Sequence, residues 1–503
     1  MLSNRQLDSI GASYVFNLLE PCSPYGAELA RKPHFYSESE HDELTQELEH
    51  VRKLALALNE RSEAFVRTER ALMQLKDVRR SVEKSVEFKL STDAARSSSS
   101  ERSEGVELGD VELFELKRFL IRLETLVPCY RQLCPGGLYG IEINAFTEAL
   151  DIIDPDGMRA LIFRISDRCS EEIAHIRAER RRVDLALRNA NAGEKDGLIA
   201  ERTLLIAREE AEEARLRADM TRRLGSYAES ILVTISGIAK LDFAMAKTRL
   251  LVKYGGSIPK VLAISSELSL KAMVNPQVAA ALNEKGRSFT PVDIMLNTGS
   301  AVITGANMGG KSVAVKALAL NVYLALCGLP VFCEEATIPH FSDIHLISED
   351  MEDSQGGLSS FGGEMVQFDR ILRSCEEKGL SLVLLDEFAR GTNPHEGAAL
   401  VRAAVRYFNR DAHTIALITT HFDDVAKFAA MHYQVMGLRN ADRDALSAAL
   451  SGGGEGKARV LERFMDYGLY PASSDANPPR DALTICHALG VRQEFMNLVE
   501  SNQ

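Results

Sequence analysis

The chain has 503 residues, of which 45% are hydrophobic and 26% are charged, and its formal net charge is −13. This length is too great for one compact core, so we expect about three domains, and without an apolar run near ~20 residues we expect no membrane-spanning segment. The acidic balance disfavours a protein whose main task is to hold DNA, because strong duplex binders neutralise phosphates with a basic surface. The eight cysteines form no C-x-x-C pair and the N-terminus lacks an apolar signal sequence, which indicates reduced thiols in a cytoplasmic protein.

Helical periodicity dominates the first part of the chain. Residues 1–90 repeat apolar side chains at spacings of three and four, as in 44–51, and are expected to form an N-terminal helical segment. Residues 91–108 are polar and serine-rich. Because they have too little apolar surface to fold, we expect them to be a linker or a mobile loop.

Residues 109–285 are expected to form an all-α core with two long helices. Apolar residues between Ile162 and Leu187 form one stripe, and those between Leu216 and Ile238 form a second at near-heptad spacing. Residues 189–197 between the stripes are rich in turn formers. The pattern predicts two antiparallel helices joined by a short turn, each reaching ~40 Å at 1.5 Å per residue.

Short β-rich runs alternate with helical stretches over residues 286–503. The runs are 301–304, 380–385, 414–419 and 433–438. Continuous apolar strands separated by helices predict an α/β domain whose parallel sheet is covered on both faces.

A phosphate-binding motif begins directly after the first of these strands. Residues 305–312, Gly-Ala-Asn-Met-Gly-Gly-Lys-Ser, satisfy G-x-x-x-x-G-K-[ST] between a strand and a helical run. The glycines let backbone N–H groups close around phosphates at a helix N-terminus. Lys311 is expected to reach the β- and γ-phosphates of ATP, and Ser312 to ligate Mg²⁺. The expected ATP-binding residues are Gly305, Asn307, Gly309, Gly310, Lys311, Ser312 and Val313.

Two acidic residues and a histidine follow the next strands. Asp386 and Glu387 end an apolar run, and His421 follows the strand 414–419. Asp386 is expected to hold Mg²⁺ and Glu387 to polarise the attacking water, because phosphoryl transfer depends on positioning and charge stabilisation. His421 is expected to contact the γ-phosphate, although a histidine taken alone in such a place is more often an ordinary loop residue.

These motifs together resemble the ATPase of the MutS family, a branch of the ABC ATPases. The resemblance rests on 304–312, on 386–392 with the sequence Asp-Glu-Phe-Ala-Arg-Gly-Thr, and on Thr-Thr-His at 419–421. The segment 358–365, Leu-Ser-Ser-Phe-Gly-Gly-Glu-Met, resembles the signature of that family. The resemblance implies an ABC-type ATPase domain over 286–503 that hydrolyses ATP with Mg²⁺.

The resemblance also implies that two such domains pair into composite sites, in a homodimer or a heterodimer. The residues expected to face the nucleotide of the other subunit are Ser359, Ser360, Gly362 and Gly363. The loop expected to cross the dimer interface comprises Gly391, Thr392 and Asn393. Phe289 lies sixteen residues before Gly305, where the family stacks an aromatic ring on adenine. A buried core phenylalanine would fit this position nearly as well.

Outside the ATPase the resemblance is weaker. The residues Pro24-Tyr25-Gly26 and the segments 154–157 and 241–249 resemble the lever-helix core of the second bacterial MutS subfamily. The clamp that family members insert between the levers would be reduced here to 189–197. We expect neither a mismatch-reading domain before the levers nor a nuclease-type extension after the ATPase.

The two leading functions differ in the client on which ATP-driven lever movement would act. The acidic charge and the reduced clamp favour a partner protein, and truncated chains of this build resemble reactivating ATPases of adenosylcobalamin-dependent aminomutases such as lysine 5,6-aminomutase. The alternative is a DNA-structure or mismatch-binding ATPase of DNA repair or recombination control. A catalytically silent binding module is disfavoured, because every hydrolytic residue is in place. DNA contacts would come from a cluster for which a solvated helix face is the simpler interpretation, namely Arg177, Arg180, Arg181 and Arg182.

Overall fold

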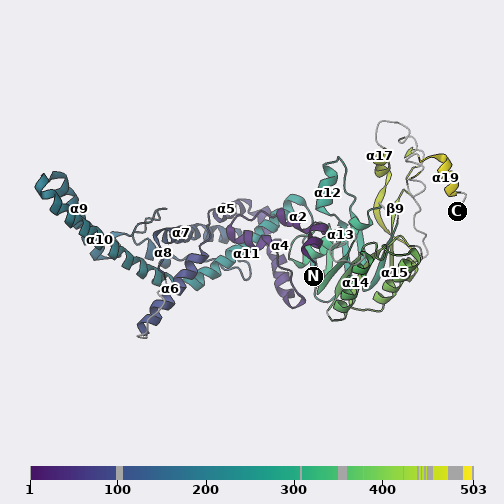
Figure 1. Ribbon diagram of the computed structural model, residues 1–503, viewed down its shortest axis with the longest axis horizontal. Coiled ribbons are helices and arrows are strands. Elements are labelled where there is room, and N and C mark those ends of the chain that lie inside the picture. Colours follow the sequence, from purple (N-terminus) through teal and green to yellow (C-terminus); the bar gives the residue numbers. More distant parts are fainter. Residues whose placement is uncertain are drawn as a thin grey trace. The chain divides into compact units, whose positions relative to one another are not determined.

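The computed structural model divides the chain into two compact units, which we call the helical unit and the sheet unit (Figure 1). The helical unit comprises Glu20–Lys32 and Lys53–Ala246, and the sheet unit comprises Met1–Leu19, Pro33–Arg52 and Lys247–Gln503. The predicted N-terminal segment 1–90 is therefore shared between the two units. The structure describes residues 2–97, 106–305, 309–348, 360–377, 379–422, 424–438, 441–442, 445–446, 449, 457–473, 486 and 491–500.

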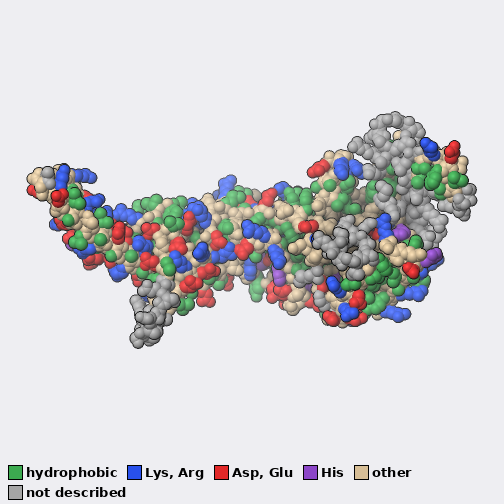
Figure 2. All heavy atoms as spheres, in the orientation of Figure 1, with side chains coloured by type: hydrophobic (Ala, Val, Ile, Leu, Met, Phe, Trp, Pro, Cys, Tyr) green, Lys and Arg blue, Asp and Glu red, His purple; other side chains and the backbone are tan. Residues whose placement is uncertain are grey.

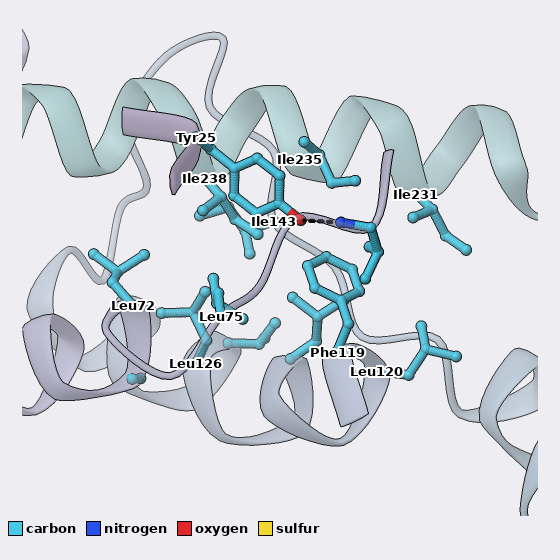
Figure 3. Packing of buried hydrophobic residues seen from close by; sticks show 14 of the residues in the cluster. Tyr25, Leu72, Leu75, Phe119, Leu120, Leu126, Ile143, Ile231, Ile235 and Ile238 are labelled. Atoms are coloured by element: carbon cyan, nitrogen blue, oxygen red, sulfur yellow. Dashed lines mark hydrogen bonds between the residues drawn. The ribbon is translucent and has the colours of Figure 1, made fainter. Parts of the chain in front are cut away.

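Among the described residues, the helical unit has one main apolar core and two smaller buried clusters. Its helices are α3 (Pro24–Arg31), α5 (Ser62–Leu72), α6 (Arg79–Ser97), α7 (Asp110–Leu133), α8 (Thr147–Ile153), α9 (Glu171–Asn189) and α10 (Ala192–Leu224), with α4 (His41–Glu60) and α11 (Ala228–Tyr254) running through both units. The two smaller clusters lie along α9 and α10. Figure 3 shows Tyr25 and Phe119 among the isoleucines of α11, and the two rings meet edge to face with centroids 6.3 Å apart. Each large side chain buried in this way contributes about 1.5–3 kcal/mol to stability.

Two short motifs noted in the sequence meet at the start of α3. Asp242 of α11 accepts hydrogen bonds from the backbone N–H of Cys22 at 2.8 Å and from the N–H and hydroxyl of Ser23, both at 2.6 Å. A Cβ on Gly26 would lie 2.3 Å from a carboxylate oxygen of Asp242. Only glycine therefore lets α3 approach α11 this closely.

The predicted pair of long helices exists with different limits. The helix α9 begins at Glu171, because the Ser170 hydroxyl accepts the N–H of Ile173 at 3.1 Å and caps it. The residues 162–170, which the apolar stripe placed in the first helix, lie outside α9. The second stripe is divided between α10 and α11 at Gly225, where an added Cβ would lie 2.5 Å from the carbonyl oxygen of Ser85 in α6.

The predicted turn 189–197 is wrong in its extent. The Asn191 side chain accepts the N–H of Glu194, and the Glu194 carboxylate accepts the N–H of Asn191, both at 3.3 Å. This capping box starts α10 at Ala192. The connection between the two helices is therefore Ala190 and Asn191 alone, and α9 and α10 pack against each other as a hairpin (Figure 1).

The arginine cluster on α9 is largely paired within this hairpin. Arg177 is only 2% exposed, and its guanidinium donates to Glu209 at 2.8 Å, to Asp167 at 2.7 Å and to Glu213 at 2.6 Å. Arg180 also donates to Glu209. The simpler interpretation, a solvated helix face, is wrong for Arg177, and so is a direct role of this side chain in DNA binding.

Replacing Arg177 by Ala should lower the free energy of unfolding of the helical unit by about 3 kcal/mol. The change leaves Asp167, Glu209 and Glu213 without their shared cation, and the partial exposure of Asp167 keeps the loss near the lower end of the range for buried pairs. Urea denaturation followed by circular dichroism measures the effect. Arg181→Ala on the exposed side of α9 is the control and should cost less than about 1 kcal/mol. Equal losses in the two variants would contradict the assignment.

The described residues of the sheet unit form two sheets. The six-stranded sheet has the order β10-β9-β4-β8-β7-β6, and all neighbours are parallel except β10 and β9. Its strands are β4 (Gly299–Thr304), β6 (Asp343–Ile347), β7 (Ser381–Leu385), β8 (Thr414–Thr419), β9 (Met431–Gly437) and β10 (Asp466–Pro471). The four-stranded sheet has the order β1-β5-β2-β3 and is formed by β1 (Lys260–Leu262), β2 (Glu267–Met273), β3 (Val292–Asn297) and β5 (Glu335–Pro339). The prediction of a parallel sheet is confirmed.

Helices accompany the large sheet. They are α13 (Lys311–Leu326), α14 (Ser360–Glu377) and α15 (Pro394–Phe408), with α1 (Asn4–Ile10), α2 (Ala12–Asn17), α12 (Pro276–Asn283), α17 (Lys457–Phe464) and α19 (Gln493–Glu500). Apolar residues of α14 and α15 form one buried cluster with residues of β7 and β8. The predicted linker 91–108 overlaps α6, which continues to Ser97, and its residues 98–105 lie outside the described ones. Within the described ranges, no helix combines the length and apolarity needed to cross a membrane.

Candidate nucleotide site

The phosphate loop leaves the centre of the large sheet. All six residues of β4 are buried, and the chain turns at Gly305 with φ +144°. Gly310 ends the loop with φ +86° as the N-cap of α13. A Cβ on Gly305 would lie 3.0 Å from the carbonyl oxygen of Val435, so this turn needs glycine for both its conformation and its space. Gly309 is buried beside Gly310, while the predicted contact residue Asn307 lies outside the described residues.

Lys311 opens α13 and points back across the loop. Its side chain is only 3% exposed, and Nζ donates to the carbonyl oxygen of Gly305 at 2.9 Å. The same Nζ lies 3.6 Å from Oε1 of Glu387. Burial lowers the pKa of Lys311, and the carboxylates of Glu387 and Asp386 act in the opposite direction. The loop therefore holds a buried cation directly beside the two predicted acidic residues.

Asp386 lies at the carboxyl end of β7 in a hydroxyl-rich setting. Its Oδ1 accepts a hydrogen bond from the Thr419 hydroxyl at 2.7 Å. Burial raises the pKa of Asp386, and hydrogen bonds from Thr419 and from Ser312 oppose that rise. A carboxylate beside a serine hydroxyl is the hard oxygen pair that Mg²⁺ accepts, with phosphates and waters completing the shell. Ser312 and Asp386 thus fit the predicted metal.

Glu387 follows in a backbone conformation that is uncommon for a residue with a Cβ. Its φ is +51°, and its N–H donates to the Thr419 hydroxyl at 2.8 Å. Its Oε2 accepts from Arg390 at 2.9 Å, and its side chain is 12% exposed. Glu387 is therefore fixed at the backbone and at both carboxylate oxygens.

His421 follows β8, the strand that lies between β4 and β7 in the sheet. Its ring packs against Phe422, with centroids 4.4 Å apart. Partial desolvation lowers the pKa of His421, and the Glu387 carboxylate opposes the effect. The lowered pKa favours the neutral imidazole, which has one N–H to donate.

A cavity of about 1100 Å³ extends outward from the phosphate loop. Its lining includes residues 309–314 and Glu387. Phe289 also lines it and is half-buried, so the interpretation as a core phenylalanine does not apply. Tyr467 and Arg463 are further lining residues. Val313, which the sequence predicts to bind ATP, also lines the cavity.

The predicted signature and interface residues lie elsewhere. Gly362 and Gly363 are in the first turn of α14, which begins at Ser360, and Ser359 lies outside the described residues. The loop 391–393 precedes α15, where the Asn393 side chain accepts the N–H of His395 at 2.9 Å. None of the described residues that line the cavity comes from these two segments.

Sequence reasoning missed several residues that contact the site. Thr419 is fully buried and bridges Asp386 and Glu387, and it could have been suspected because it stands two residues before His421. Arg390 lies within the motif that follows β7. Its hydrogen bond to Glu387 depends on how the chain turns after that strand, which the sequence does not show. Tyr467 gives no signal at all, since it lies far along the chain and its ring stands 3.3 Å from a Cβ added to Gly310.

Known proteins resemble this part of the chain. Residues 301–449 match the model of MutS domain V. An endonuclease MutS2 from Caldanaerobacter subterraneus subsp. tengcongensis is 31% identical over 244 residues, which cover 47% of this chain and 29% of that protein. A DNA mismatch repair protein MutS from Shouchella clausii is 29% identical over 307 residues, which cover 60% of this chain and 34% of that protein.

The extent of these matches is limited. The matching part of the chain spans about a third of the length of these two relatives. The cavity residues Phe289, Arg463 and Tyr467 lie outside the segment that matches MutS domain V. These matches show that residues 301–449 are similar to MutS domain V and that this part of the chain resembles MutS and MutS2 proteins at about 30% identity.

Proposed function

We propose that the cavity binds ATP and that the site hydrolyses it with Mg²⁺. The observation that carries the proposal is the meeting of Lys311, Asp386 and Glu387 beside the phosphate loop. Lys311 Nζ lies 3.6 Å from Glu387 Oε1, and the Ser312 hydroxyl is hydrogen-bonded to Asp386. A buried cation next to two carboxylates at the carboxyl end of one strand of a parallel sheet is an arrangement that suits phosphoryl transfer to water.

Each side chain has a separate task in this proposal. Lys311 releases its contacts with Gly305 and Glu387 and neutralises the β- and γ-phosphates. Mg²⁺, held by Ser312 and Asp386, would supply charge stabilisation to the phosphate oxygens. Glu387 accepts a hydrogen bond from the attacking water and orients it. His421, which follows β8, donates a hydrogen bond to the γ-phosphate.

The direct test is phosphate release by the full chain in the presence of ATP, with Mg²⁺ or with EDTA. Release that saturates with ATP and stops with EDTA is the expected result. A chain that binds ATP but releases no phosphate with Mg²⁺ would overturn the proposal.

We also propose that a second chain completes the site. By resemblance, Gly362 and Gly363 face a γ-phosphate, yet they lie outside the cavity of their own subunit. The loop 391–393 is likewise outside it, at the surface before α15. These two segments would therefore act on a nucleotide bound by another chain. This arrangement fits a composite site between two ATPase domains, in a homodimer or a heterodimer.

DNA is the client that the comparisons favour. The relatives are named as a DNA mismatch repair protein and as an endonuclease, and nothing in the comparisons supports an aminomutase-reactivating ATPase. We therefore place the alternative interpretation from the sequence, a DNA-structure-binding ATPase, ahead of the protein client. ATP binding and hydrolysis would move the helical unit on DNA.

The described residues of the helical unit form no evident basic surface for DNA on the face that Figure 2 shows, and a partner protein is therefore the second candidate for the client. Arg177 is withdrawn into ion pairs, and Arg181 lies 3.8 Å from Asp167. On the face shown in Figure 2, Lys and Arg side chains of this unit alternate with Asp and Glu. A mixed surface offers a duplex less net attraction than a basic stripe.

Fluorescence polarisation with matched, mismatched and branched duplexes should separate the two clients. If DNA is the client, we expect one structured duplex to bind at least about a thousandfold more tightly than the matched duplex near 150 mM salt. Phosphate contacts should be few because Arg177 is sequestered, and three remaining arginines give a slope of log affinity against log salt of about −3. If all three duplexes bind equally and weakly, and binding is lost by 150 mM salt, then a partner protein is the better candidate for the client.

Two changes of exposed arginines test where the DNA binds, and the second of them, Arg67→Gln, is the control. Arg181→Gln with Arg182→Gln should make the salt slope shallower by about 2, since each phosphate contact contributes about 0.9. Arg67→Gln, an exposed arginine on α5 paired with Glu63, should leave the slope unchanged. A slope that responds equally to both changes would place the DNA elsewhere on the chain.

A further inference from the structure

The turn after β7 carries two residues in the left-handed region of backbone space that favours glycine. Glu387 has φ +51° and Ala389 has φ +60°, and both side chains carry a Cβ. Such conformations are uncommon in residues other than glycine and persist only where surrounding contacts hold them. The direction in which the Glu387 carboxylate points depends on this turn.

Several contacts hold the turn, and one helix supplies two of them. The N–H of Ala389 donates to Oε1 of Glu364 in α14 at 3.1 Å. The ring of Phe388, between the two strained residues, packs on Phe368 of the same helix with centroids 4.6 Å apart. Ala389 and Phe388 are both buried, so water cannot replace these contacts easily.

The opposite side of the turn is closed by backbone. A Cβ on Gly397 at the start of α15 would lie 2.7 Å from the carbonyl oxygen of Ala389. Both backbone polar groups of Ala389 are therefore enclosed, since its carbonyl lies against α15 and its N–H donates to the Glu364 carboxylate. Loss of Glu364 would leave a buried N–H without this acceptor in a backbone conformation that already costs free energy.

We propose that Glu364 is a positioning residue for hydrolysis, which acts by fixing the Glu387–Ala389 turn through the Ala389 N–H. The inference rests on the proposed ATPase function and adds a residue to it that touches neither ATP nor the attacking water. Glu364 follows Gly363 directly, so the same helical turn of α14 carries the residues proposed to face the other subunit's nucleotide. Displacement of α14 by that nucleotide would change the orientation of Glu387 in its own site.

The test compares three variants of the full chain at Glu364 and Asp369. Glu364→Ala should lower kcat by about ten- to a hundredfold, because a small misplacement of a positioned group has effects of that size. The affinity for a fluorescent ATP analogue should stay within about twofold, since Lys311 and the phosphate loop are untouched. Glu364→Gln keeps an acceptor oxygen and should recover most of the activity. Asp369→Ala, an exposed position on the same helix, should behave like the unaltered chain.

A double variant distinguishes positioning from a general loss of structure. Glycine adopts positive φ without the steric cost of a Cβ, so Ala389→Gly should restore part of the kcat lost in Glu364→Ala. An unchanged kcat in Glu364→Ala, while the unaltered chain hydrolyses ATP, would overturn this inference and leave the proposed function standing. Equal losses of kcat and analogue affinity, without recovery in Glu364→Gln, would also overturn it. No Mg²⁺-dependent hydrolysis in the unaltered chain would refute the proposed function itself, and this inference with it.

Discussion

Glu387→Gln should reduce phosphate release by at least about a hundredfold while ATP binding survives. The amide is nearly isosteric with the carboxylate and still accepts a hydrogen bond from Arg390, so the geometry around Glu387 Oε2 can be kept. It cannot take on the negative charge that polarises the attacking water. Removing a carboxylate 3.6 Å from Lys311 also removes a competitor for that cation, so affinity for ATP should be equal or higher.

Two measurements on the same preparation check this expectation. Phosphate release under saturating ATP gives kcat, and a fluorescent ATP analogue gives the dissociation constant. Glu376→Gln at the end of α14, where the carboxylate accepts from the Tyr407 hydroxyl, is the matched control and should leave both unchanged. If Glu387→Gln lowers binding and turnover together with the fold intact, Glu387 acts on the phosphates or the metal and not on water.

Lys311→Ala should instead weaken ATP binding, by about ten- to a hundredfold. The side chain is 3% exposed, so its charge acts on the phosphates with little screening by solvent. Hydrogen bonds to charged groups are worth about 1.5–3 kcal/mol, and each 1.4 kcal/mol is a factor of ten in affinity. Isothermal titration calorimetry with ATP and Mg²⁺ gives the dissociation constant directly.

The control for this variant is Lys271→Ala, an exposed lysine on β2. It should bind ATP like the unaltered chain. Circular dichroism of Lys311→Ala is needed beside the titration, because the change leaves Glu387 without a buried cation nearby. Unaltered affinity in a folded Lys311→Ala chain would show that the phosphates are bound elsewhere.

The sequence predicts those features best that depend on a few consecutive residues. The strands β4, β7, β8 and β9 were recognisable because a strand buried on both faces is a continuous apolar run. The phosphate loop was recognisable because its residues have fixed spacing between a strand and a helix. In both cases the pattern and the structure that it forms lie within a few consecutive residues.

The first and last residues of helices are predicted less accurately, because a single hydrogen bond or close contact can shift them. The composition of 189–197 is typical of a turn, yet the capping box of Asn191 and Glu194 makes most of that segment the start of α10. Gly225 divides the second apolar stripe for a reason that lies in another helix, the close approach of Ser85 in α6. The apolar spacing itself continues through the break and therefore does not reveal it.

The sequence by itself determined that a glycine-rich loop with the G-x-x-x-x-G-K-[ST] spacing follows a buried strand, that two acidic residues follow another, and that both strands belong to a parallel sheet. Only the tertiary structure decided which further side chains act on those groups. The Thr419 hydroxyl is hydrogen-bonded to both Asp386 and Glu387, and the Glu364 carboxylate accepts the N–H of Ala389 in the turn that contains Glu387. The tertiary structure likewise buries Arg177, whose charge the sequence alone would place on a helix surface. The physical reason is that hydrogen bonding and desolvation depend on neighbours that folding brings together, whereas residue spacing describes one element at a time.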